Sequence, residues 1–218
     1  MIAPLGPPTI LPLGDAGLLV RFGATLSDEA NRATIAFARQ LRRAFPAGVV
    51  EIDPNLVSVL LKYDPERMSF ERLAGEVRLL LSGSHASAID GGQTYRVAVS
   101  FNGADLEGVC RGLAMTEAEF VAAHNARPLR VLTTGFAPGF VYCGFPSEAM
   151  RLPRRADVRP PVPAGTVLFA AGQTAITSTP VPTGWHVIGT TAFRNFDAAA
   201  DPPTRLREGD HIAFEVAP

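Results

Sequence analysis

Cysteine is scarce in this chain, with two residues among 218, Cys110 and Cys143. They lack metal-ligand spacing and form no disulfide framework, so a reducing compartment, the cytoplasm, is expected. A surplus of one charge is also missing, because 20 basic and 21 acidic residues give a formal net charge of −1. This balance argues against nucleic acid or an anionic membrane surface as the main partner.

Long hydrophobic runs and export signals are missing as well. No apolar stretch approaches the length of about 20 residues that crosses a bilayer. The first residues, MIAPLGPPTILPLGD, carry four prolines and no early basic residue, which is unlike a secretory signal. We therefore expect a soluble cytoplasmic protein that has no membrane partner.

Motifs that carry chemistry by themselves are not found either. The sequence contains no GxxxxGK[ST], no GxSxG, no HExxH and no CxxC, and no GxGxxG joins a strand to a helix. A P-loop, a Rossmann site, a nucleophile elbow and a common zinc site are therefore unsupported. No metal ligands are predicted.

Apolar periodicity in the first part of the chain predicts the order β-α-β-β-α. Strands are expected over residues 17–22, 49–52 and 57–63, where apolar residues alternate. Helices are expected after Ser27 and after Ser69, because a serine hydroxyl can cap the first turn. This order is most of a ferredoxin-like unit.

A small polar segment, SGSHASAIDGGQ at residues 82–93, follows and is the best boundary candidate. We therefore predict two domains, residues 1–88 and 89–218. A strand over 95–101 can belong to either domain. Beyond it, Asp105 is expected to cap a short helix, and Thr116 and Glu119 form a capping-box pattern for another.

The second part of the chain reads as short strands separated by glycine- and proline-rich turns. This spacing predicts a barrel or a sandwich, and hence an α+β fold class. The expected strands cover residues 130–134, 140–143, 166–171, 175–178, 186–189, 191–196 and 211–216.

The run TTGFAPGFVYCGF, residues 133–145, is the most distinctive stretch. Glycine allows backbone angles that other residues avoid and proline fixes one, so a rigid, partly buried turn is expected. Its aromatic side chains either pack the barrel or form an apolar binding wall.

Two polar features lie near this turn in the sequence. His124 ends a predicted helix, where the charged imidazole is favoured and can titrate near neutrality; the alternative is a plain helix-end cap. Arg154, Arg155 and Arg159 stand among prolines, and their guanidinium forks suit carboxylate or phosphate. The alternative for this cluster is a solvated loop.

The motifs GFAPGFVY, PRR-x3-R-x3-PAGTV, AAGQT and TGWHVIG, with LGDAGLLVRFG and LLKYDP nearer the start, occur in that combination here. In this the chain resembles the KipI family, whose members are also called allophanate hydrolase subunit 1 or the B component of 5-oxoprolinase. The resemblance implies an N-terminal ferredoxin-like α/β domain followed by a C-terminal cyclophilin-like β-barrel.

The resemblance also implies an activity and partners. The family's B component belongs to an ATP-dependent 5-oxoprolinase, a hydrolase that opens the cyclic amide 5-oxoproline to L-glutamate. It acts with a KipA-type C component (an allophanate hydrolase subunit 2 homologue) and a LamB/YcsF-type A component. ATP would then be bound in the complex, because this chain has no nucleotide motif of its own, and the site would be shared between the components.

On this basis one pocket is predicted at a rim of the barrel, where loop ends lie close together. Gln173, Thr174 and Trp185 can also be read as a turn and as core, and the resemblance favours a functional role for Gln173. The predicted catalytic residues are His124, Arg155 and Gln173. The predicted substrate-binding residues are Phe136, Pro138, Gly139, Phe140, Arg154, Arg159, Thr174 and Trp185.

Two other functions stay open at this point. KipI itself is an inhibitor of a sporulation sensor histidine kinase, so a regulatory binding protein with no turnover is one alternative. The other is a stand-alone relative of the matching domain of urea carboxylase. The allophanate hydrolase label is not taken literally, because the serine-rich amidase signature is missing.

Overall fold

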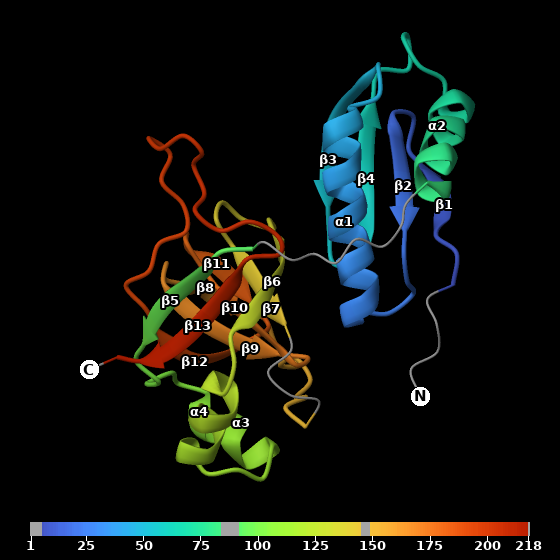
Figure 1. Cartoon of the computed structure of the whole chain (residues 1–218). Helices are drawn as coiled ribbons and strands as arrows, with labels where there is room; N and C mark the ends of the chain where they lie inside the picture. Colours follow the sequence, from blue (N-terminus) through green and yellow to red (C-terminus); the bar gives the residue numbers. More distant parts are fainter. Residues whose placement is uncertain (1–5, 84–91, 145–148, 218) are drawn as a thin grey trace. The chain divides into compact units, whose positions relative to one another are not determined.

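The computed structural model describes residues 6–83, 92–144 and 149–217. The chain divides into two compact units, Met1–Asp90 and Gly91–Pro218 (Figure 1). The predicted boundary between residues 88 and 89 lies outside the described residues. Each unit has a hydrophobic core of its own.

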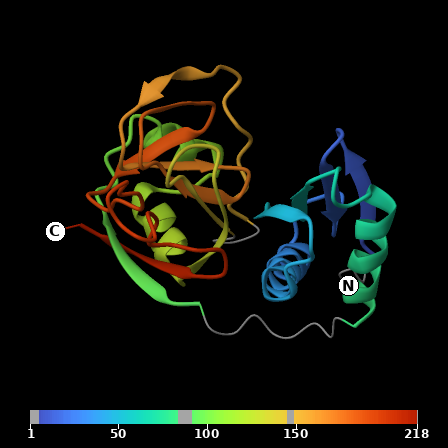
Figure 2. The ribbon, with the colours of Figure 1, turned by 90° about the horizontal axis from the view of Figure 1, so that it is seen from above.

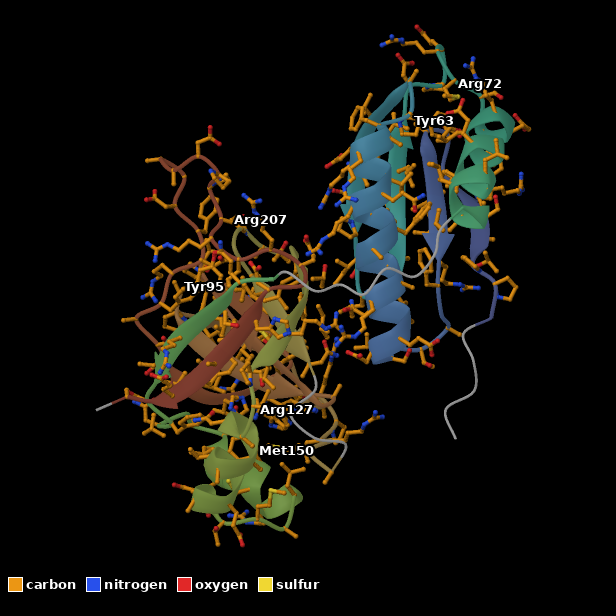
Figure 3. The ribbon with its side chains drawn as sticks, in the orientation of Figure 1. Tyr63, Arg72, Tyr95, Arg127, Met150 and Arg207 are labelled. Atoms are coloured by element: carbon orange, nitrogen blue, oxygen red, sulfur yellow. The ribbon has the colours of Figure 1, made fainter. Side chains whose placement is uncertain are left out.

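The first unit is a four-stranded antiparallel sheet in the order β1-β2-β4-β3. Its strands are β1 (Thr9–Leu13), β2 (Gly17–Arg21), β3 (Val49–Pro54) and β4 (Ser58–Tyr63). The helices α1 (Asp28–Ala44) and α2 (Phe70–Ser82) pack on one face, where alternate strand residues such as Leu18 and Val59 share their core. The Tyr63 hydroxyl donates a hydrogen bond to the Asp15 carbonyl at 3.3 Å (Figure 3).

The predicted β-α-β-β-α order is confirmed as β2-α1-β3-β4-α2. Strand β1 was not predicted, because most of its residues are exposed and no alternation marks it. It pairs with β2 at the edge of the sheet, where its Pro12 is tolerated because one side of an edge strand needs no partner.

Side-chain caps begin the helices largely as the sequence predicts. The Ser27 and Ser69 hydroxyls accept from the N–H groups of Ala30 and Arg72, at 3.1 and 3.3 Å. In the second unit, Thr116 and Glu119 form the predicted capping box of α4 (Glu117–Asn125). Asp105 precedes α3 (Leu106–Gly112), but the predicted side-chain cap is wrong because its carboxylate binds elsewhere.

The second unit is a seven-stranded sheet in the order β12-β9-β10-β7-β6-β13-β5. The sheet curls so that Ser100, after β5, pairs with Thr190 at the end of β12 (Figure 2). The expected strand over 95–101 therefore belongs to this unit, and it pairs in parallel with β13. The strands are β5 (Thr94–Val99), β6 (Leu129–Thr134), β7 (Val141–Gly144), β9 (Thr166–Ala170), β10 (Gln173–Ile176), β12 (His186–Thr190) and β13 (His211–Val216).

The two faces of this curled sheet have different cores. Every strand contributes side chains to an inner core that includes α3 and α4. On the outer face, Leu168, Ala170 and Ala175 pack with Phe140 and Trp185. A two-stranded ribbon, β8 (Arg159–Val162) and β11 (Val181–Thr183), adds Val162 and Val181 to this outer core.

The mixed α+β fold, an α/β unit followed by a curled β-sheet, is as predicted from the sequence. Two details differ. Residues 191–196 form no strand, apart from one bridge at Phe196, and the ribbon strands β8 and β11 were not predicted. Two of the four residues of β8 are prolines, which weakens any strand signal there.

Candidate functional site

The aromatic turn between β6 and β7 is held in an unusual backbone conformation. Gly135 and Gly139 have φ values of 123° and 68°, and the non-glycine Phe136 has φ 72°. A side chain at Gly139 would collide with Phe196, whose Cβ would lie 2.4 Å away. The left-handed region is unfavourable for a bulky residue, and yet Phe136 is 72% exposed. The turn therefore presents an aromatic ring to solvent at a conformational cost.

A continuous row of rings leads from this turn onto the outer face of the sheet. We call Phe136, Phe140, Tyr142 and Trp185 the aromatic row. Successive ring centroids lie 5.5, 4.8 and 5.7 Å apart. Phe140 and Trp185 are buried, so the row is an exposed edge on a packed base. The sequence alternatives, packing or a binding wall, thus apply to different members of one row.

Arg154 lies over the end of the aromatic row. Its Cζ atom is 5.6 Å from the Trp185 ring centroid, within the range of a cation–π interaction. The positive charge of Arg154 also acts on the Tyr142 hydroxyl, although burial dominates and raises the pKa of that group. Tyr142 therefore keeps its proton at neutral pH and remains a hydrogen-bond donor.

The segment that carries Arg154 is anchored on both sides. Met150, before it, is completely buried in the inner core (Figure 3). The Leu152 carbonyl accepts from the Ala171 N–H at 2.6 Å, and the Pro153 carbonyl lies 3.0 Å from Nε2 of His186. The Arg155 N–H donates to the Gly184 carbonyl at 2.8 Å. These bonds fix the backbone beneath Arg154.

The other two arginines of the basic cluster bind an aspartate of this chain. Arg155 Nη1 lies 3.0 Å from Asp105 Oδ1, and Arg159 Nη2 lies 2.6 Å from Asp105 Oδ2. The Val187 N–H donates to the same carboxylate at 2.7 Å. Although burial alone would raise the pKa of Asp105, these bonds and both positive charges hold it below its ordinary value.

We call Asp105, Arg155 and Arg159 the Asp105 cluster. The Asp105 carboxylate is 13% exposed, so this is a largely enclosed ion pair and not the solvated loop that was the alternative. Asp105 was missed as a partner because it lies far from these arginines in the sequence. A carboxylate predicted as a helix cap was the only available signal.

His124 lies in the inner core, and its predicted titration near neutrality is wrong. Its ring is fully buried among Phe101, Phe120 and Phe214, with centroids 5.6, 5.8 and 5.0 Å away. Nε2 lies 2.8 Å from Thr174 Oγ1. Burial lowers the pKa of His124 from 6.5 to about 4, so the ring is neutral at physiological pH.

Strand β10 separates the predicted site residues into two groups. Thr174 contacts His124 on the inner side, whereas its neighbour Ala175 packs in the outer core. Because side chains alternate along a strand, Gln173 lies on the outer side with Ala175. The structure brings Phe136, Phe140, Arg154 and Trp185 together in one outer site and places His124 and Thr174 across the sheet from it.

The remaining predicted residues have structural surroundings that can be stated plainly. Gln173 is 6% exposed, and its Oε1 atom accepts no hydrogen bond within the described chain. Gly139 accepts through its carbonyl from Ser178 Oγ at 3.0 Å and Asn195 Nδ2 at 3.2 Å. Pro138 lies within the exposed turn beside Phe136. Their roles in binding or catalysis stay predictions.

Metal and membrane features were searched over the same residues. Within residues 6–83, 92–144 and 149–217, no three His, Cys, Asp or Glu side chains gather as a possible metal group. No helix in this part of the chain is long and apolar enough to cross a membrane.

The architecture defines the class of protein before any closer relative is considered. The chain superposes on part of the crystal structure of Kluyveromyces lactis urea carboxylase with a TM-score of 0.76. The match covers 97% of this chain and 22% of that protein at 15% identity, which shows a shared fold. The α/β unit followed by a curled sheet is thus a known two-part architecture.

The chain belongs to the family described as carboxyltransferase domain, subdomain C and D, whose model matches residues 8–206. It is homologous to the B component of 5-oxoprolinase, as the sequence resemblance predicts. The Bacillus subtilis (strain 168) protein of that name is 30% identical over 215 residues, 93% of this chain and 90% of the relative. The Escherichia coli O157:H7 protein is 34% identical over 172 residues, 76% and 77%.

A solved structure agrees with this assignment. The crystal structure of TTHA0988 matches with a TM-score of 0.80 and 36% identity over 93% of this chain. This chain spans 40% of that protein. The curated relatives are named as subunits, which places this chain among proteins that work in a complex with other 5-oxoprolinase subunits.

Proposed function

We propose that this chain is the B component of an ATP-dependent 5-oxoprolinase, which opens 5-oxoproline to L-glutamate. One observation carries the proposal: the chain aligns at 30% identity over 93% of its own length and 90% of the Bacillus subtilis B component. The alignment therefore covers both units of the fold.

The reaction has a physical requirement that fits a shared site. An unactivated amide resists water, and transfer of a phosphoryl group from ATP to the lactam oxygen would make it a better electrophile. Developing negative charge would then need cationic or hydrogen-bonding groups. This sequence contains no nucleotide-binding motif, so we propose that ATP binds with the help of the partner proteins.

The proposed partners are a KipA-type C component and a LamB/YcsF-type A component. Within this chain, Arg154 and the aromatic row support contact with the carboxylate and ring of the substrate. Gln173 lies on the same side of the sheet and remains a proposed participant. Any influence of His124 on the reaction passes from the inner core through Thr174 and the strand that carries Gln173.

Reconstitution tests this proposal. This chain and homologues of the C and A components from the same genome are purified and mixed with 5-oxoproline and ATP, and L-glutamate and ADP are measured. We expect both products only when all three proteins and ATP are present. Equal glutamate formation without this chain, or none from the complete mixture, would overturn the proposal.

A further inference from the structure

The three arginines of the basic cluster have different partners in the fold. Arg155 and Arg159 share the Asp105 carboxylate. Arg154 has no carboxylate partner within the described chain, and its guanidinium group lies over an aromatic ring. The charge of Arg154 is thus the one in this cluster that remains available to an anion.

A second donor lies beside Arg154. The Tyr142 hydroxyl makes no hydrogen bond within the described residues and is close enough to Arg154 for the two groups to interact electrostatically. Tyr142 and Arg154 both approach Trp185, at 5.7 Å between ring centroids and 5.6 Å from Cζ to the centroid. A guanidinium fork and a phenol hydroxyl together can bind the two oxygens of one carboxylate.

The support beneath this donor pair is rigid. Trp185 is 6% exposed and packs in the outer core, so it is a fixed base for the guanidinium plane. The backbone on each side of Arg154 is hydrogen-bonded to the β9–β10 and β11–β12 turns, through Leu152 and Arg155. Donors that are already positioned lose less entropy when a ligand binds.

The surroundings of the donor pair are apolar. Tyr142 continues through Phe140 to the exposed ring of Phe136. A small acid with a flat body can therefore place its carboxylate on the donors and its ring along the aromatic row. A phosphate or a larger polyanion would gain nothing from these rings.

We propose that Arg154 and Tyr142 form the carboxylate subsite of this chain, and that it takes a small organic acid with a flat ring, the class that includes 5-oxoproline. This inference rests on the proposed function and deepens it by assigning the substrate carboxylate to one arginine. Arg155 and Arg159 are then structural, because they are already bound to Asp105.

Binding of 5-oxoproline to the full-length chain tests the subsite. Trp185 is the only tryptophan, so its fluorescence reports on the residue directly beneath Arg154. Calorimetry gives an independent Kd. We expect saturable binding of 5-oxoproline and much weaker binding of 2-pyrrolidinone, which has the same ring without the carboxylate.

Three variants give the residue assignment. Arg154→Gln should weaken binding of 5-oxoproline by at least about ten-fold, since hydrogen bonds to charged groups are lost. Tyr142→Phe should weaken it by a smaller factor of roughly three to ten, because one neutral donor is removed. Arg151→Gln is the matched control, since it removes the same charge from a nearby exposed position and should leave Kd unchanged.

The outcomes separate this inference from the proposed function. Absence of saturable binding, equal binding of 2-pyrrolidinone, or unchanged binding by Arg154→Gln would overturn the subsite. Full turnover of an Arg154→Gln complex would do the same while leaving the 5-oxoprolinase role intact. Arg154-dependent binding, together with a wild-type complex that makes no glutamate, would support the subsite and overturn the proposed function.

Discussion

His124 is neutral in the folded chain because burial removes its ring from water. Its pKa falls from 6.5 to about 4, so between these values the unfolded chain binds a proton that the folded chain does not. The free energy of unfolding should therefore be highest above pH 6.5 and fall by about 1.4 kcal/mol per pH unit as the pH drops toward 4. Urea unfolding at several pH values measures this slope.

The matched variant is His124→Gln, which keeps a polar group beside Thr174 and does not titrate in this range. It should be less stable than the wild type near pH 7, and the gap should narrow as the pH falls. Equal slopes in both proteins between pH 4 and 6.5 would show that His124 does not carry the effect.

Asp105 provides a second residue-scale prediction. Asp105→Asn leaves two arginines without a carboxylate in a largely enclosed place, so we expect a loss of about 2–4 kcal/mol in the free energy of unfolding. Asp28→Asn is the control, because Asp28 and Arg32 form an exposed pair with side-chain exposures of 53% and 46%. That change should cost less than about 1 kcal/mol. Equal losses would contradict a special role for Asp105.

The same cluster changes what is expected of Arg155. As a residue of a solvated loop it could be removed without effect on stability, but Arg155→Ala now takes one partner from Asp105. Sequence indicated which side chains suit an anion, and it could not tell whether the anion is a ligand or Asp105. Residue types were thus predictable, whereas their partners depend on tertiary contacts fifty residues apart.

At the scale of elements, the curled sheet closes through a very close backbone approach. A Cβ atom at Gly189 on β12 would lie 2.5 Å from the Ser100 carbonyl oxygen, next to the bridge between Ser100 and Thr190. Gly189→Ala should therefore force the two chain segments apart and lower the stability of the second unit by about 1–3 kcal/mol. Chemical denaturation followed by Trp185 fluorescence reports on this unit.

Gly108→Ala is the control for this prediction. Gly108 lies in α3, and a Cβ atom there would have no neighbour within 4 Å. Alanine in a helix is better than glycine by about 0.5–1 kcal/mol, so this variant should be more stable than the wild type. A destabilisation of Gly108→Ala as large as that of Gly189→Ala would attribute the effect to glycine replacement in general.

Elements with a strong local signal were predictable, and those without one were not. Capping serines and an alternating strand pattern marked α1, α2 and the central strands of the first unit. Strand β1 and the ribbon strand β8 carry proline and exposed residues, so they exist only because a neighbouring strand pairs with them. The run 191–196 has strand-like residues but lacks such a neighbour.

At the scale of the whole molecule, motif resemblance supplied what periodicity could not. Local patterns gave a β-α-β-β-α unit followed by many short strands. The parallel pairing of β5 with β13 joins the start and end of the second unit, and no local pattern encodes it. The side of the sheet on which each site residue lies also depends on strand register, which is why one predicted pocket became an outer site and an inner histidine.

The exposed ring of Phe136 leads to a prediction about assembly. Phe136 has φ 72° and is 72% exposed, which combines backbone strain with apolar exposure. We expect this ring to be covered by the C-component homologue, because a buried aromatic anchor can contribute about 2 kcal/mol or more at an interface. Phe136→Asn should weaken the complex about thirty-fold, measured by calorimetry and by co-elution at micromolar concentration.

This substitution separates assembly from folding. Asparagine tolerates the left-handed region far better than phenylalanine, so relief of strain offsets the lost contact with Phe140, and stability should change by less than about 1 kcal/mol. Leu79→Asn is the control, since Leu79 is 73% exposed in α2 of the other unit. It removes a similar exposed apolar group and should leave the complex intact. If Phe136→Asn assembles as tightly as the wild type, the strained turn does not serve the interface, and its exposed ring is left to the small-acid site on the aromatic row.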